Sequence, residues 1–100
     1  MTRPRISVIV PCLNHGQFIE RTICSVLDQG YRNLQLLVVD AGSTDETTDA
    51  LRLDEDLNWW ATDGRGGLAG AINEALAKAD GAIVGILPGD SLYLPGTLDA

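Results

Sequence analysis

The stretch LQLLVVDAGSTDET, residues 34–47, decides how this chain folds. Its apolar first part predicts a buried strand over residues 34–39, because strands covered on both faces are continuous apolar runs rather than alternating ones. The strand runs into an acid, Asp40, and the small residues at 41–42 predict a turn before Ser43. The stretch therefore predicts a strand that brings a carboxylate to a loop at the end of a sheet.

The same stretch predicts a helix directly after the loop. Ser43 and Glu46 have the spacing of a capping box, so the helix is expected to point its free N–H groups back at the strand end. A helix N-terminus at such an edge favours anions, and we expect a nucleotide or another phosphate-bearing ligand near Asp40. An Asx turn at Asp40 would explain the same residues without a ligand.

Composition limits the classes of function. Fourteen acidic and seven basic residues give a net charge of −7, which repels a long polyanion and argues against nucleic acid as a partner. No segment approaches the roughly 18 apolar residues of a membrane span. The two cysteines, Cys12 and Cys24, cannot form a dense disulfide framework, and no His/Cys spacing suggests zinc. We therefore expect a reducing, cytoplasmic compartment, with attachment to the inner face of the membrane through a segment outside these residues as an open alternative.

The length suits one domain, and 45% hydrophobic with 21% charged residues is typical of a globular chain. Pro95, in the sequence LPGTLDA, has the position of a residue in the first turn of a helix, and no cap follows Ala100. A parallel sheet of this size would also leave an edge uncovered. We therefore expect residues 1–100 to be the N-terminal part of a larger unit.

Strand and helix patterns alternate along the whole chain. Four apolar runs predict strands, at residues 5–10, 34–39, 57–62 and 82–87. Helical patterns lie between them: from Asn14 up to Gly30, for about two turns after Ser43, and over residues 71–79. The order β-α-β-α-β-α-β with short connections predicts an α/β fold, in which a parallel, Rossmann-like sheet has helices on both faces.

The first strand and the first helix carry finer predictions. Pro11 lacks an N–H group, so the strand over residues 5–10 is expected to end there. Asn14 and Gln17 have capping-box spacing, which predicts a helix beginning after Asn14. Its apolar residues recur at helical intervals and are expected to pack on the sheet as one stripe: Phe18, Ile19, Ile23, Val26 and Leu27.

A polar side chain follows each predicted strand: Asn14, Asp40, Asp63 and Asp90. All strands of a parallel sheet point the same way, so these four groups should lie along one edge. Core packing does not explain such a coincidence. We interpret this edge as the binding site.

The glycine-rich segment 64–70 lies between a predicted strand and a predicted helix. Its spacing, GxGGxxG, does not match a dinucleotide fingerprint, and residues 82–89 lack the acid that would contact a ribose in an NAD-dependent oxidoreductase. A loop beside a phosphate and a plain flexible loop explain the glycines equally well.

Four further side chains have ordinary structural interpretations. We interpret Cys12 as a small buried thiol rather than a nucleophile, because no orienting group for a nucleophile is evident. His15, the one histidine, is interpreted as a loop or capping residue. Trp59 and Trp60 are expected to point to opposite faces of the sheet and into the core.

Four segments, taken in order, resemble the N-terminal half of a family 2, GT-A-type glycosyltransferase: ISVIVPCLNHGQFIERTICSVLDQGY, LLVVDAGSTDET, DGRGGLAGAINEALAKADG and AIVGILPGDSLYLPGTL. The resemblance implies a GT-A fold, a nucleotide-diphosphate sugar as donor, a glycan or glycoconjugate as acceptor, and a role in polysaccharide or glycoconjugate synthesis. It also implies an inverting transfer that uses a carboxylate base beyond Ala100. The 100-residue chain alone is therefore expected to be inactive.

By this resemblance, one part of the edge would hold the base and ribose of the donor. The first loop contributes Pro11 and Asn14. The loop after the second strand contributes Asp40, and the turn that follows contributes Gly42 and Ser43. These five residues come from two strand ends that a parallel sheet would place side by side.

The resemblance places the diphosphate of the donor beside a second group of residues. Asp63 and Arg65 would lie near the base or the diphosphate. Asp90 would correspond to the DxD-type motif that holds a divalent metal, Mg²⁺ or Mn²⁺, on the donor phosphates. Such a hard cation prefers oxygen ligands and would neutralise the charge that builds on the leaving nucleoside diphosphate.

Two positions depart from the family pattern. Ala41 stands where many members have a second acid that often contacts the base of the nucleotide. The sequence therefore does not indicate which nucleotide base is bound. The turn at 88–91, Pro-Gly-Asp-Ser, has one acid where members commonly show two or three, and weaker metal binding is expected. The alternative is a non-catalytic nucleotide-binding module or a degenerate pseudo-transferase, which turnover of a donor would exclude.

Overall fold

A computed structural model describes residues 3–99 of the chain. Strands and α-helices alternate in the predicted order, and a short 3₁₀ helix, η1 (Thr97–Asp99), follows the last strand. The elements are β1 (Ile6–Cys12), α1 (Ile19–Leu27), β2 (Leu34–Asp40), α2 (Thr47–Arg52), β3 (Trp59–Ala61), α3 (Gly67–Lys78) and β4 (Ile83–Ile86).

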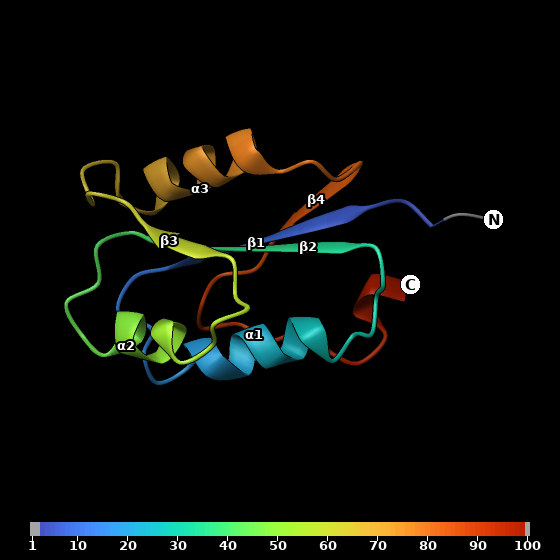
Figure 1. The fold of residues 1–100 in the computed structure, drawn as a ribbon, viewed down its shortest axis with the longest axis horizontal. Coiled ribbons are helices and arrows are strands. Elements are labelled where there is room, and N and C mark those ends of the chain that lie inside the picture. The colour runs from blue at the N-terminus through green and yellow to red at the C-terminus, as the bar shows by residue number, and fades with distance from the viewer. Residues whose placement is uncertain (1–2, 100) are drawn as a thin grey trace.

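The four strands form one sheet in the order β3-β2-β1-β4, and every pair of neighbours is parallel. β1 and β2 pair along seven residues each, from Ile6 opposite Leu34 to Cys12 opposite Asp40. Helices α1 and α2 cover one face of the sheet and α3 covers the other (Figure 1). The predicted parallel α/β fold with helices on both faces is confirmed.

The core lies in two layers on either side of β1 and β2. Alternate β1 residues face α1 and α2, where the buried side chains are Ile6, Val8, Val10, Cys12, Ile19, Ile23, Val26, Val38 and Leu51. The opposite face packs Ile9, Leu37 and Val39 against Ala71 and Ala75 of α3. Because both faces of the two central strands are covered, their sequences are apolar throughout.

β1 continues through Pro11 and ends at Cys12, one residue beyond the predicted end. The carbonyls of Ile9 and Pro11 accept hydrogen bonds from the amides of Leu87 and Gly89. The backbone N–H and C=O groups of odd-numbered β1 residues therefore point towards β4. At Pro11 the β4 strand has already ended at Ile86, and the missing N–H group therefore breaks no ladder bond. The prediction of a strand end at Pro11 was wrong for this reason.

The predicted start of the first helix was also wrong. α1 begins at Ile19, and no side chain caps it. Asn14 lies in the left-handed region, with φ of 56°, and its side chain bonds to the loop after β2 instead. The predicted stripe is only partly buried: Phe18 and Leu27 are 45% and 50% exposed, whereas Ile19, Ile23 and Val26 are buried as expected.

The predicted capping box at Ser43 and Glu46 does not form. The Ser43 hydroxyl donates to Asp40, and α2 begins only at Thr47. The loop therefore extends three residues past Ser43 before the helix starts. Once formed, α2 is short, as predicted. The backbone N–H of Thr47 donates to the side chain of Asp45, which satisfies one free donor of the first turn.

The outer strands are shorter than predicted, and α3 is shifted. β3 has three residues and β4 has four, and Ile83 and Ile86 of β4 are about half exposed. α3 begins at Gly67, four residues before the expected start. Trp59 and Trp60 pack against opposite faces of the sheet, as predicted, and both are partly buried.

Two glycines near the sheet provide a matched test of the packing. A Cβ at Gly81 would lie 2.6 Å from the backbone nitrogen of Ser7, whereas a Cβ at Gly70, inside α3, would meet nothing within 4 Å. We expect Gly81→Ala to lower the free energy of unfolding by about 1–3 kcal/mol through overpacking. Gly70→Ala should raise it by up to about 1 kcal/mol, because alanine favours the helix.

Urea denaturation of the purified protein and both variants measures the difference. Equal stability of the two variants would contradict the close approach of Gly81 to β1.

Candidate functional site

Backbone hydrogen bonds join the ends of all four strands at one edge of the sheet. The amide of Ala41 donates to the carbonyl of Cys12 at 2.9 Å, which joins the ends of β2 and β1. The amide of Thr62, after β3, donates to the carbonyl of Asp40 at 2.8 Å. The amide of Gly89, after β4, donates to the carbonyl of Pro11 at 3.0 Å. The predicted meeting of the strand ends at one edge is confirmed.

Asp40 is buried at the centre of this edge, with 1% of the residue exposed. One carboxylate oxygen accepts hydrogen bonds from the amides of Gly42 at 3.3 Å and Ser43 at 3.0 Å. The other accepts from the Ser43 hydroxyl and, at 3.7 Å, from the Cys12 thiol. Four donors match the roughly four lone-pair sites of a carboxylate. Asp40 therefore holds the turn at Gly42 and Ser43 in place, and its contact with a base or ribose stays a prediction.

Cys12 lies beneath the turn and is buried, as the sequence predicts. Burial and the neighbouring Asp40 carboxylate raise the pKa of the Cys12 thiol to about 12. A thiol with this pKa is almost entirely protonated at neutral pH, so it is a poor nucleophile. The interpretation of Cys12 as a structural thiol agrees with this geometry.

Asn14 joins the loop after β1 to the loop after β2. Its backbone amide donates to the Ser43 hydroxyl at 2.9 Å, and its side-chain oxygen accepts from the amides of Thr44 at 2.8 Å and Asp45 at 3.3 Å. The amide of Gly16 donates back to the Asp45 carboxylate at 3.1 Å. Four of the predicted site residues are brought together by these contacts and those of Asp40: Asn14, Asp40, Gly42 and Ser43. Pro11 lies in β1 opposite Val39, the residue before Asp40.

Asp45 remains charged over a wider pH range than an ordinary aspartate. A hydrogen bond from the Thr47 hydroxyl, together with the amides of Thr47 and Gly16, lowers the pKa of the Asp45 carboxyl. The charge thus strengthens the bond from Gly16, and the contact between the two loops persists at mildly acidic pH.

The loop after β3 packs against the loop after β2 through two glycines. Gly42 and Gly64 have φ of 101° and 81°, and a Cβ on Gly42 would lie 3.3 Å from the Cα of Gly64. This backbone approach brings Asp63 and Arg65 to the same edge. The Asp63 carboxylate accepts from the amide of Arg65 at 3.0 Å, and the two side chains form an exposed ion pair at 3.6 Å.

The turn that carries Asp90 is fixed from below by residues for which the sequence predicted no such role. The carbonyl of Gly89 accepts a hydrogen bond from the buried Thr22 hydroxyl of α1 at 2.9 Å. A Cβ on Gly89 would lie 2.7 Å from Nδ1 of His15, so only glycine fits over that ring. Nε2 of His15 lies 4.0 Å from the Asp90 carboxylate. Sequence periodicity could not predict these contacts, because Gly89 is 67 residues from Thr22 and Asp90 is 75 residues from His15.

The donor atoms at the Asp90 turn fit one mode of metal binding. Within residues 3–99, His, Cys, Asp and Glu side chains do not gather in any group of three that could hold a metal ion. The Asp90 side chain is 54% exposed and is the carboxylate of that turn. Mg²⁺ and similar ions are commonly held by one or two carboxylates, with substrate phosphates and water completing the shell. The turn therefore fits a cation that arrives with, or is completed by, a phosphate ligand.

Sequence comparison identifies one family. A family model described as "Glycosyl transferase family 2" matches residues 7–100. The putative teichuronic acid biosynthesis glycosyltransferase TuaG of Bacillus subtilis (strain 168) is 36% identical over a match that covers 97% of this chain. The same match covers 40% of TuaG, so the chain spans less than half the length of this curated relative.

Two solved structures share the fold. The mannosyltransferase PcManGT from Pyrobaculum calidifontis, in complex with GDP-Man and Mn²⁺, has a TM-score of 0.84 and 37% identity over 98% of this chain and 31% of that chain. S. aureus TarS in complex with UDP has a TM-score of 0.83 and 29% identity over 95% of this chain and 30% of that chain.

None of the helices within residues 3–99 has the length and apolar content that crossing a membrane requires.

The two cysteines should differ sharply in reactivity. Cys24 is exposed on α1, whereas Cys12 is buried with a raised pKa. We expect a disulfide reagent such as DTNB at pH 8 to modify one thiol of residues 1–100 in the folded protein and two in guanidinium chloride. Cys24→Ser should remove the fast reaction. Rapid modification of Cys12 in the folded Cys24→Ser variant would contradict the buried edge described here.

Proposed function

The chain belongs to glycosyl transferase family 2, and we propose that residues 1–100 form the donor-binding part of an inverting glycosyltransferase. The observation that carries this proposal is the edge where the ends of four parallel strands are joined and where Asp63, Arg65 and Asp90 are exposed. The structural relatives with GDP-Man and Mn²⁺, or with UDP, support a nucleotide-diphosphate sugar as donor.

In this proposal the loops after β1 and β2 hold the base and ribose. Asp40 fixes the turn, so that the exposed Gly42 and the neighbouring Ser43 present backbone and hydroxyl groups to the nucleotide. Pro11 and Asn14 complete the wall from the β1 side. The base contacted here stays open, because Ala41 supplies no side-chain hydrogen bond.

The diphosphate would lie between the loops that carry Arg65 and Asp90. The chain has a net charge of −7, so a diphosphate needs local positive charge to bind. Arg65 is exposed and can turn from Asp63 towards a phosphate. Asp90 would hold Mg²⁺ or Mn²⁺, and the bound ion would neutralise charge on the leaving nucleoside diphosphate. His15 and Thr22 position the Asp90 turn from beneath.

The transfer itself would break the bond between the anomeric carbon and the phosphate oxygen, and would form a bond to a hydroxyl oxygen of a glycan or glycoconjugate acceptor. We propose that a carboxylate base outside residues 1–100 accepts the proton of that hydroxyl. A cytoplasmic location agrees with the free thiols Cys12 and Cys24. A role in polysaccharide or glycoconjugate synthesis agrees with the name of TuaG as a teichuronic acid biosynthesis glycosyltransferase.

Titration calorimetry of the full-length native protein with UDP-, GDP- and dTDP-sugars in Mn²⁺ tests the donor site. We expect one nucleotide class to bind. Asp90→Asn should weaken binding about tenfold, equal to about 1.4 kcal/mol, and the difference should disappear in EDTA. Asp40→Ala should weaken binding by loosening the turn.

The control is Asp80→Asn, whose carboxylate pairs with Arg5 at 2.6 Å at the opposite edge of the sheet. It should bind donor like the unmodified protein. Unchanged affinity in both Asp40→Ala and Asp90→Asn would remove the assigned site. Donor binding without hydrolysis or transfer would favour the non-catalytic module, and NMR of the first-formed anomer would test inversion.

A further inference from the structure

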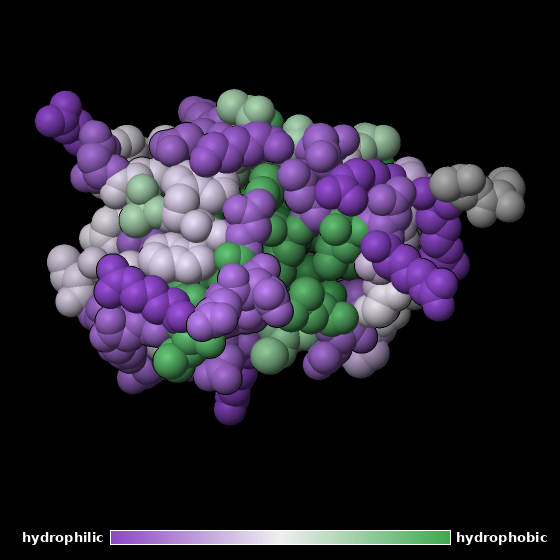
Figure 2. Space-filling model, in the orientation of Figure 1, coloured by the Kyte–Doolittle hydropathy of each residue, from purple (hydrophilic) through white to green (hydrophobic). Residues whose placement is uncertain are grey.

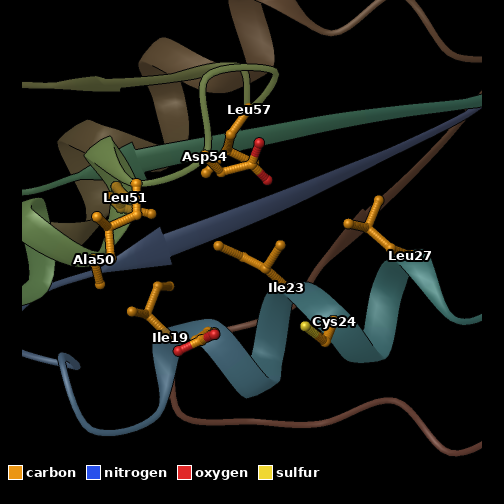
Figure 3. Close-up of a pocket in the computed structure, with 10 residues that line it drawn as sticks. Ile19, Ile23, Cys24, Leu27, Ala50, Leu51, Asp54 and Leu57 are labelled. Atoms are coloured by element: carbon orange, nitrogen blue, oxygen red, sulfur yellow. The ribbon is translucent and has the colours of Figure 1, made fainter.

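A groove lies between α1 and the segment that follows α2, outside the residues assigned to the donor. Its volume is about 220 Å³. Figure 3 shows Ile19, Ile23, Cys24 and Leu27 along α1, facing Ala50, Leu51, Asp54 and Leu57 across the groove. A second hollow of about 250 Å³ shares Leu27, Asp54 and Leu57 with the first and continues past Leu36. The two hollows form one elongated surface, which we call the α1 groove.

The walls of the α1 groove are apolar and open to solvent. Leu27 is 50% exposed and Leu53 is 86% exposed, although both line the groove. Figure 2 shows apolar surface gathered between α1 and the sheet on this face of the molecule. Exposed contiguous apolar surface with a polar border is typical of interaction sites.

The charged side chains that line the α1 groove are all acidic. Glu20 and Asp54 line the first hollow, and Asp54 and Asp56 line the second. Neither lining includes a lysine or an arginine. Arg52, at the end of α2, pairs with Asp49 rather than with these acids. An occupant of this groove therefore needs apolar side chains at its centre and positive charges at its border.

An amphipathic helix meets both requirements. Helices dock in elongated apolar grooves through residues at positions i, i+3, i+4 and i+7, and the flanking polar residues can carry the complementary charge. A membrane surface fits less well, because anionic headgroups would be repelled by Glu20, Asp54 and Asp56. We propose that the α1 groove binds an amphipathic helix of a partner protein whose polar face carries lysine and arginine.

The α1 groove and the donor site do not share residues. No residue that lines either hollow belongs to the predicted donor set, and Leu36 lies early in β2, four positions before Asp40 at the donor edge. A partner helix could therefore be bound while the donor edge is free. The inference does not depend on the proposed transfer reaction.

Cys24 reports directly on occupancy of the groove. It lines the groove and is exposed, whereas Cys12 is buried. In the full-length protein, cysteines other than Cys12 and Cys24 are replaced by serine. The probe is an 18-residue peptide of leucine and lysine with leucines at helical spacing, and the control peptide has glutamate in place of each lysine. Maleimide labelling of Cys24 measures protection, and fluorescence anisotropy measures Kd.

We expect the lysine peptide, at about nine times its Kd, to slow labelling of Cys24 about tenfold by mass action. The glutamate peptide should give no protection. Glu20→Lys should weaken binding of the lysine peptide about fivefold or more, since it reverses a charge at the border of the groove. Asp28→Lys is the matched control, because Asp28 is the exposed C-cap residue of the same helix and lines neither hollow.

Leu53→Ser gives a second, independent variant, because this exposed side chain can be replaced without disturbing the core. It should weaken binding of the lysine peptide, while the circular dichroism spectrum of the protein stays unchanged. Equal binding of the two peptides, no binding of either, or equal effects of Glu20→Lys and Asp28→Lys would overturn the proposal. So would slow labelling of Cys24 without peptide, which would mean that the protein's own chain covers the groove. Protection by phosphatidylglycerol vesicles but not by the lysine peptide would assign the groove to a membrane and also overturn it.

Discussion

The buried carboxylate of Asp40 accepts the hydrogen bonds that hold together the edge where the strands end. It ends the central strand β2 and accepts four hydrogen bonds, two from backbone amides of the following turn and two from the side chains of Ser43 and Cys12. A buried donor left without a partner destabilises a fold by about 1–3 kcal/mol, so one carboxylate fixes the whole turn. Through Ser43, the same carboxylate is linked to Asn14 and the loop after β1.

Close backbone contacts hold the rest of the edge together. The charged groups there are a few exposed side chains. Gly89 approaches His15 where a Cβ would collide, and Gly42 lies against Gly64 where a Cβ would be tightly packed. The fixed loops then present Asp63, Arg65 and Asp90 to solvent. Since the whole chain is acidic, the proposed binding of a diphosphate at this edge would need Arg65 and a cation to offset the surrounding field. The backbone contacts between the loops thus hold the few charged side chains of this edge in position.

The two faces of the sheet are covered unequally, and this explains why one side has a groove. On the α3 side, the small side chains of Ala71 and Ala75 let the helix lie close to the sheet. On the other side, α2 is short and the segment after it is irregular, so Leu53 and Leu57 do not seal the surface of α1. The donor edge and the α1 groove consequently lie on different parts of the same two-layer frame.

Sequence patterns alone were enough to predict the alternation of strands and helices, their parallel direction, and the position of Asn14, Asp40, Asp63 and Asp90 at one edge. These follow from local apolar periodicity and from the direction that short crossovers impose. Long-range packing, which local patterns do not reveal, makes β1 pass through Pro11 and makes Asn14 and Ser43 bond across loops instead of capping helices. It also places Thr22 and His15 beneath the Asp90 turn. In each case a partner 28 to 75 residues away in the chain outcompetes the local pattern, because a buried polar group takes whichever partner the packed sheet places beside it.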